Sequence, residues 1–226
     1  MKKIIRVWDL PIRLFHWLLV LCIITSFITV KIGGNAMELH ALSGYCILTL
    51  IIFRVFWGLI GSYHARFINF VPSPKRLLQY LTGKTSGGLG HNPLGALSVL
   101  ALLGSVGVQA ITGLFTNDDI AFEGPFAKYV SSGTVELLTS IHYFNEKILI
   151  AVIALHLCAI FYYQKFKGEN LIKPMLLGDK EIDPSDEAKH LPADLGRASK
   201  DGGLQRGFAL LLLGLIALIL IYFIKR

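Results

Sequence analysis

Long apolar stretches dominate this sequence and constrain its fold more than any other feature. Five of them, each about 18–23 residues, are long enough to cross the hydrocarbon core of a bilayer as helices. A hydrophobic content of 54% and a mean hydropathy of +0.59 agree with a membrane protein. The sequence therefore predicts an all-α integral membrane fold. The predicted spans are Leu14–Ile32, Ala41–Ile60, Leu94–Phe115, Ile141–Tyr163 and Gly207–Ile224.

Basic residues are unevenly distributed between the loops. Lys and Arg gather before the first span, between the second and third, and after the fourth, whereas the alternate loops are acidic and carry few of them. By the positive-inside rule, this distribution predicts a cytoplasmic N-terminus. The net charge of +7 belongs mostly to these cytoplasmic flanks, so it requires no nucleic-acid partner.

Two histidines of the fourth predicted span share one helix face. His142 and His156 are 14 residues apart, which places them about 21 Å apart along a helix and within roughly 40° of one direction. His16, at the cytoplasmic end of the first span, matches His156 in depth. His40, at the outer entry of the second span, matches His142. The alternative is that each histidine is an interfacial residue at the end of a span.

This pairing by depth points to a cofactor. Ionisable residues inside spans indicate a functional site, and bis-imidazole ligation of two b-type haems requires one histidine from each of two facing helices, at two depths. No C-x-x-C-H motif is present, which excludes covalently attached c-type haem. The four N-terminal spans are therefore expected to form a bundle that holds two haem b groups.

An arginine within the second predicted span supports the same hypothesis. Arg54 follows His40 by 14 residues and shares its helix face, toward the cytoplasmic side. Because no acidic residue falls within the first three predicted spans, a haem propionate is its expected partner. The alternative is that the guanidinium reaches the lipid headgroups. Gly44 and Gly58 lie on this stripe and leave space either for a flat porphyrin or for a close helix contact.

The motif GHNPLG precedes the third span and is a candidate quinone site. Asn92 is a suitable N-cap and Pro93 a suitable first helical residue. His91 lies at the cytoplasmic mouth, where it can hydrogen-bond a quinone carbonyl or relay a proton. The alternative is an ordinary interfacial histidine.

The remaining segments are polar or amphipathic. Residues 72–83 predict a short helix on the membrane surface. A polar group at the exit of the third span, Thr112, Asn117, Asp118 and Asp119, is either a solvated helix end or a docking edge for a basic partner. We divide the chain into a core (1–180), a cytoplasmic linker (181–206) and an additional transmembrane helix (207–226).

Several motifs resemble one known family in order and spacing. They are RVWDLPIRLFHW, HALSGYCILTLIIFRVFWGLIGSYHARF, GHNPLG, TGLFTNDD and IHYFNEKILIAVIALH. Together they resemble the bacterial cytochrome b561 family, and more closely the b-type cytochrome subunits of nickel–iron hydrogenases and relatives paired with periplasmic c-type cytochromes. The resemblance covers roughly residues 4–180, whereas the linker and the fifth helix depart from it.

The resemblance implies a function as well as a fold. It implies that His16, His40, His142 and His156 are the axial ligands of two haems, and that quinone binds near the cytoplasmic haem, close to His91 and Asn92. Electrons would move across the bacterial inner membrane between quinone or quinol and a periplasmic redox protein, either a c-type cytochrome or a hydrogenase.

Both directions of electron flow fit these residues. No catalytic residue is predicted, and homo-oligomers are compatible with the sequence. Two alternatives also remain: a self-contained quinol-dependent enzyme that acts on superoxide or ferric iron, and a non-haem membrane anchor subunit.

Overall fold

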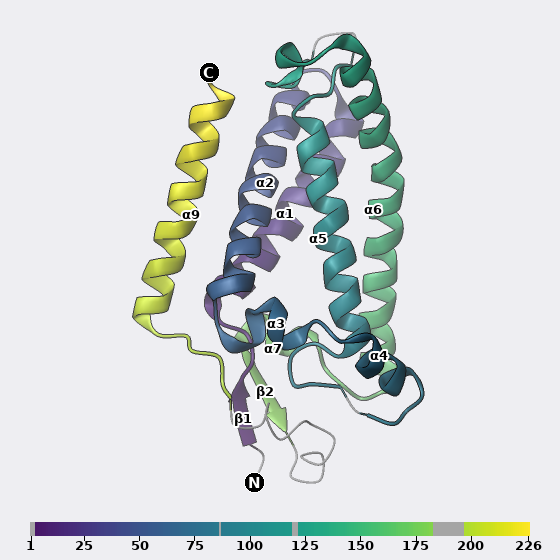
Figure 1. Cartoon of the computed structure of the whole chain (residues 1–226), viewed down its shortest axis with the longest axis vertical. Coiled ribbons are helices and arrows are strands. Elements are labelled where there is room, and N and C mark those ends of the chain that lie inside the picture. Colours follow the sequence, from purple (N-terminus) through teal and green to yellow (C-terminus); the bar gives the residue numbers. More distant parts are fainter. Residues whose placement is uncertain (1–2, 86, 119–121, 183–196) are drawn as a thin grey trace. The chain divides into compact units, whose positions relative to one another are not determined.

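Long helices make up most of the computed structural model, which describes residues 3–85, 87–118, 122–182 and 197–226. Within these ranges, five helices are long and apolar enough to cross a membrane. They are α1 (Leu10–Ile32), α2 (Ala36–Ile60), α5 (Pro93–Gly113), α6 (Ser132–Phe166) and α9 (Gly203–Ile224) (Figure 1). The predicted all-α membrane fold is confirmed. Asp119, which we assigned to the polar group after the third span, lies outside the described residues.

Short elements fill the connections between the long helices. Strand β1 (Lys3–Arg6) precedes α1. Between α2 and α5 lie a 3₁₀ helix η1 (Tyr63–Ala65), α3 (Phe67–Phe70) and α4 (Pro74–Leu81), and η2 (Ala127–Tyr129) precedes α6. After α6 come α7 (Ile172–Leu177) and strand β2 (Asp179–Ile182). Helix α4 is the predicted surface helix. The Ser73 hydroxyl accepts a hydrogen bond from the Arg76 amide at its start, 3.3 Å away, and Leu78 and Leu81 are exposed.

Each of the long helices begins before the apolar stretch that predicts it. Helix α6 begins at Ser132, nine residues before the predicted start at Ile141, and α2 begins at Ala36 rather than Ala41. Polar and small residues in these first turns do not interrupt a helix, although they end the apolar stretch. Hydropathy therefore locates the membrane-embedded part of each helix and underestimates the helix itself.

The chain groups into two compact units, each built from three segments. Unit 1 comprises Met1–Leu14, Arg54–Ala101 and Ala154–Ala209, and unit 2 comprises Phe15–Phe53, Leu102–Ile153 and Leu210–Arg226. Residues are grouped into a unit because they contact one another, and the segments of each unit are not consecutive in the sequence. The division into a core, a linker and an additional helix remains a prediction.

Unit 2 has an apolar core formed by four helices. Ile47 and Ile51 of α2 pack with Val106 of α5 and Leu149 of α6. Side chains of α1, including Phe27, pack against this cluster. A buried polar contact joins α5 to α6. There the Asn145 amide donates to the Ser105 carbonyl, 2.9 Å away, and to the Gln109 side-chain oxygen, 2.7 Å away.

Unit 1 contains a two-stranded sheet formed by residues far apart in the sequence. Strands β1 and β2 pair antiparallel, with Lys3 opposite Ile182 and Arg6 opposite Asp179 (Figure 1). The Arg6 guanidinium also donates to the Asp179 carboxylate in a bidentate pair, at 2.6 and 2.9 Å. The predicted linker, residues 181–206, therefore begins within strand β2.

Asp201 ties the start of α9 to the start of α1 within unit 1. Its carboxylate, only 6% exposed, accepts hydrogen bonds from Arg6 at 2.8 Å, from Arg206 at 3.0 Å and from the Leu10 amide at 3.1 Å. Burial alone would raise the pKa of Asp201, but these hydrogen bonds outweigh it and lower the pKa below its ordinary value. Because Arg206 has this partner, it can occupy the first turn of α9, which begins four residues before the predicted Gly207.

Candidate functional site

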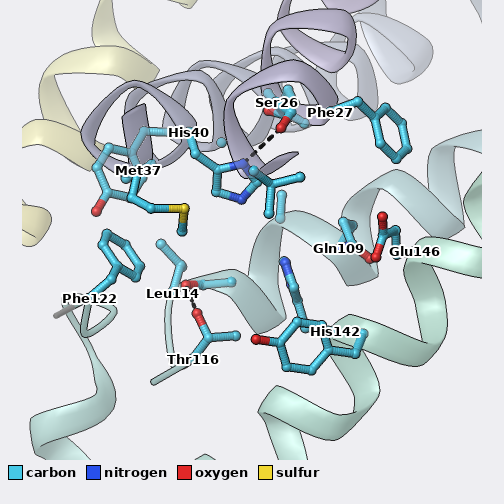
Figure 2. Close-up of a pocket in the computed structure, with 18 of the residues that line it drawn as sticks. Ser26, Phe27, Met37, His40, Gln109, Leu114, Thr116, Phe122, His142 and Glu146 are labelled. Carbon is cyan, nitrogen blue, oxygen red and sulfur yellow. Dashed lines mark hydrogen bonds between the residues drawn. The ribbon is translucent and has the colours of Figure 1, made fainter. Parts of the chain in front are cut away.

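A pocket in unit 2 is lined by α1, α2, α5, α6 and the segment that follows α5. The space among its side chains, together with the open solvent at its mouth, amounts to about 1090 Å³. Its walls are largely apolar. Figure 2 shows His40 and His142 among the side chains that line it, and the two come from different helices, α2 and α6. The structure therefore brings together the predicted outer pair of histidines.

His40 is held by the main chain of a neighbouring helix. Its Nδ1 lies 3.0 Å from the carbonyl oxygen of Ser26 on α1, the contact dashed in Figure 2. Because a carbonyl can only accept, Nδ1 must carry the proton. The lone pair therefore belongs to Nε2, on the other side of the ring.

His142 is held in the same way by a side chain of α5. Its Nδ1 is 3.1 Å from the Thr112 hydroxyl oxygen. That hydroxyl donates to the Val108 carbonyl at 2.7 Å, with the Gln109 carbonyl at 3.2 Å. A hydroxyl whose single proton is committed to a carbonyl can only accept from His142, so Nδ1 again carries the proton. Both imidazoles thus keep Nε2 as the potential ligand atom, the usual arrangement of a metal-binding histidine.

Two glycines shape this pocket differently. Gly44 lines it, and a Cβ added there would meet no atom within 4 Å, so the missing side chain leaves open space. A Cβ at Gly113 would lie 3.1 Å from Cε1 of His142. The first glycine leaves room for a flat group, and the second leaves room for the histidine ring. The residues therefore fit a haem between His40 and His142.

We expect Gly44→Phe to prevent haem binding in this pocket, because the new ring would fill the open space. Gly104→Phe is a matched control, since Gly104 also lies in a helix of unit 2 with no atom near its added Cβ but does not line the pocket. The haem-to-protein ratio of the two purified variants distinguishes them. Equal haem content in both would contradict this role for the space beside Gly44.

Charged residues also reach the pocket. Glu146, one helical turn after His142, is among the lining residues and forms an ion pair with Lys31, 3.6 Å away. Asn117 and Asp118, part of the polar group after the third span, line the mouth as well. Thr112 of the same group is buried and holds His142, which neither interpretation of that group had anticipated.

Arg54 lies in unit 1 and is buried, with 3% of its surface exposed. Its guanidinium carbon is 4.8 Å from the ring centroid of Phe67 and 5.8 Å from that of Phe70. Its Nη1 is buried and has no hydrogen-bond partner among the described residues. A buried guanidinium nitrogen without a partner can bind a further anionic group.

Sequence reasoning missed the acidic residue that accompanies Arg54. Asp9, just before α1, is fully buried and close enough to interact electrostatically with Arg54. Its carboxylate accepts from the Ile12 amide at 2.8 Å, which caps α1, and from the Trp57 indole at 3.0 Å. The available signal was Asp-Leu-Pro immediately before an apolar run, which is typical of an N-cap.

Gly58 serves helix packing in unit 1 rather than cofactor space. A Cβ there would lie 2.0 Å from a carbon of the Phe67 ring. Of the two uses proposed for the glycines of this stripe, the close contact applies to Gly58 and the open space to Gly44.

His91 lies between two aromatic rings in unit 1. Its ring centroid is 4.7 Å from that of Trp8 and 4.5 Å from that of Phe70. Its Nδ1 is buried and has no hydrogen-bond partner within the described ranges. Burial, and after it the positive charges of Arg54 and His64, lowers the pKa of His91 to about 3. The imidazole is therefore neutral at physiological pH and offers an unused polar atom.

Asn92 has the local role expected of an N-cap. Its side-chain oxygen accepts a hydrogen bond from the Gly95 amide at 2.7 Å, and α5 begins at Pro93. A small cavity beside His91 is lined in part by Tyr63, Asn69 and Arg76. His64 lines it too, and its Nε2 is 2.9 Å from the Arg197 carbonyl, in the segment before α9.

The other two predicted ligands lie on α1 and α6. His16 belongs to unit 2, with its ring centroid 4.9 Å from that of Trp17 in an edge-to-face arrangement. His156 belongs to unit 1. Both side chains are half-buried. Their pairing remains a prediction.

Comparison with known proteins identifies the relatives of this chain. A probable Ni/Fe-hydrogenase B-type cytochrome subunit of Azotobacter vinelandii is 27% identical over 139 residues, 48% of this chain and 58% of the relative. A probable Ni/Fe-hydrogenase 1 B-type cytochrome subunit of Escherichia coli (strain K12) is 24% identical over 116 residues, 39% of this chain and 49% of the relative. The chain thus spans about half the length of the curated relatives it matches.

The spanning helices and the imidazole-lined pocket define a class of protein, the multi-pass membrane cytochromes of the b type. The family described as prokaryotic cytochrome b561 matches residues 7–178, which is 172 of the 226 residues. The chain belongs to this family. The resemblance inferred from the sequence motifs is thereby confirmed.

Proposed function

We propose that this chain carries electrons across the bacterial inner membrane, between quinone or quinol and a periplasmic redox protein, through two haem b groups. The observation that carries the proposal is the pocket of unit 2, where His40 and His142 each have Nδ1 committed to an acceptor and Nε2 left for iron. Iron in a bis-imidazole haem supplies one-electron transfer without binding a substrate. We call the haem held by His40 and His142 the outer haem.

His16 and His156 would hold the inner haem. Helical spacing supports this second pair, since His156 follows His142 by 14 residues on one face of α6. Arg54 would bind a propionate of this haem, and the buried Nη1 without a protein partner supports that role. The surrounding apolar side chains would exclude water and keep the polar contacts strong.

We place the quinone site beside His91. A neutral imidazole with an unused buried nitrogen can hydrogen-bond a quinone carbonyl, and Trp8 and Phe70 flank it with aromatic surface. Asn92 contributes by capping α5, which fixes the main chain next to His91. Oxidation of one quinol here would release two electrons to the chain and two protons to the cytoplasmic side; reduction of quinone would reverse this.

The periplasmic partner would be a c-type cytochrome or a hydrogenase. The names of the relatives, which are hydrogenase cytochrome subunits, support the second. The loop charges support a cytoplasmic N-terminus. In this proposal residues 1–180 are the electron-transfer core, 181–206 a cytoplasmic linker and 207–226 an added helix, and the chain can act alone or as a homo-oligomer.

A reduced-minus-oxidised spectrum of the purified chain, with a haem-to-protein ratio, tests this function. We expect two b-type haems per chain, both reduced by quinol. One haem would contradict the two-site scheme, and two haems that quinol cannot reduce would contradict the quinone reaction.

We expect His91→Leu to slow reduction of the haems by quinol at least tenfold, because it removes the proposed hydrogen bond while keeping an apolar side chain between Trp8 and Phe70. Reduction by dithionite and the haem content should be unchanged. Stopped-flow absorbance at the haem band measures both rates. Asn69→Leu is the comparison variant, because Asn69 lines the same small cavity but its side-chain amide donates to the Tyr63 carbonyl. An unchanged quinol rate in His91→Leu would remove His91 from the site.

A further inference from the structure

We propose that Thr112 is a positioning residue that sets the reduction potential of the outer haem through its hydrogen bond to His142. The proposal rests on the proposed function, because it requires haem iron between His40 and His142. It adds a residue outside the four ligands and assigns it a measurable electronic effect.

In the hydrogen bond between Thr112 and His142, the histidine is the donor. The Thr112 hydroxyl is 2.7 Å from the Val108 carbonyl and 3.1 Å from Nδ1 of His142. Since the carbonyl takes the hydroxyl proton, the oxygen presents its lone pair to His142, and the imidazole N–H donates to it. The tautomer of His142 is therefore fixed by Thr112, with Nε2 available to iron.

The hydrogen bond between Thr112 and His142 is shielded from solvent, and its acceptor is anchored. Thr112 is 5% exposed, and its hydroxyl is anchored to its own helix one turn back. The histidine ring lies close to the main chain at Gly113, because a Cβ there would be 3.1 Å from Cε1 and 3.5 Å from Nδ1. In a low-dielectric surrounding, a fixed hydrogen bond of this kind has a strong electrostatic effect.

The two predicted ligands of the outer haem, His40 and His142, donate to different kinds of acceptor. His40 donates to a main-chain carbonyl, that of Ser26, which every residue type supplies. His142 donates to the Thr112 side-chain hydroxyl, which a single substitution removes, and the main chain of Gln109 contributes a second interaction that the substitution leaves in place. Of these two contacts, only the one at Thr112 can therefore be changed by substitution of the acceptor itself.

The expected electronic effect follows from ligand basicity. An acceptor at Nδ1–H increases the electron density that Nε2 donates and so stabilises ferric iron. Removal of the acceptor should favour the ferrous state and raise the potential. We expect a change of up to about tenfold in the reduction equilibrium, which for a one-electron couple corresponds to about 59 mV.

The test is a redox titration of three full-length variants, followed by haem absorbance. Thr112→Val keeps the shape and loses the acceptor, so the outer haem should shift to a more positive midpoint potential while the inner haem stays unchanged. Thr112→Ser keeps a hydroxyl and should restore the wild-type value. Thr116→Val is the matched control, because Thr116 lines the same pocket but its hydroxyl donates to the Gly113 carbonyl and not to a histidine.

The possible results separate the role of Thr112 from the proposed function. Two haems with an unshifted outer potential in Thr112→Val would overturn the role of Thr112 and leave the proposed function intact. An equal shift in Thr116→Val would also overturn it, because any loss of a hydroxyl from the pocket would then suffice. A wild-type protein without a haem between His40 and His142 would contradict the proposed function itself.

Discussion

Replacement of His142 by alanine is expected to leave one haem per chain instead of two. The remaining partner, His40, cannot hold a bis-imidazole haem alone, because the described residues that line the pocket include no third histidine. His40→Ala should give the same spectrum, since both variants empty the same site. His16→Ala and His156→Ala should instead remove the inner haem. The haem-to-protein ratio and the redox titration of each variant measure these losses.

The pattern across the four variants is more informative than any single loss. His190→Ala is the control, because this histidine belongs to no predicted pair and lies outside the described residues. Loss of the same haem from His16→Ala and from His142→Ala would contradict the pairing by depth. Retention of both haems in His142→Ala would contradict the site itself.

Replacement of Asp9 by alanine is expected to destabilise unit 1 more than any substitution at its surface. The change would remove the cap of α1 at Ile12, the acceptor of the Trp57 indole and a negative charge that interacts with Arg54. A lost N-cap costs about 1 kcal/mol, and a buried donor that loses its acceptor costs about 1–3 kcal/mol. The free energy of unfolding should fall by about 2–4 kcal/mol, which lowers the midpoint of thermal unfolding in detergent by roughly 5–15 °C.

Asp9→Asn separates the contributions to this effect. The amide oxygen can still cap α1, but the amide nitrogen cannot accept from Trp57, and the charge is lost. We expect a smaller fall in the midpoint than for alanine. If both variants unfold at the wild-type temperature, the buried carboxylate has no stabilising role.

The sequence predicts the long helices well because their signal is local. An apolar stretch of about 20 residues identifies a spanning helix wherever the rest of the chain lies. The surface helix α4 is likewise encoded locally, by Ser73 and Pro74 at its start. The first turns of α2 and α6 were not predicted, because these helices include polar and small residues that an apolar stretch excludes.

The site was only partly predictable, and the missing part is non-local. Depth along a helix predicted that His40 and His142 share a level, and both line one pocket. The residues that orient them are distant in sequence: Ser26 is 14 positions from His40, and Thr112 is 30 positions from His142. Sequence periodicity does not predict such contacts. The role of Asp9 was not predicted for a related reason. It precedes the span, and its buried partner, Trp57, lies 48 residues later.

The pairing of β1 with β2 has a consequence for how the chain is made. Arg6 and Asp179 are 173 residues apart, and ribosomes add about 5–20 residues per second. Roughly 10–35 s therefore pass between synthesis of the first strand and synthesis of its neighbour. Throughout this interval β1 has an open hydrogen-bonding edge, while α1, α2, α5 and α6 are already complete. The first strand of the chain is thus among the last parts to reach its final contacts, and a ribosome stalled before residue 179 would leave that edge exposed.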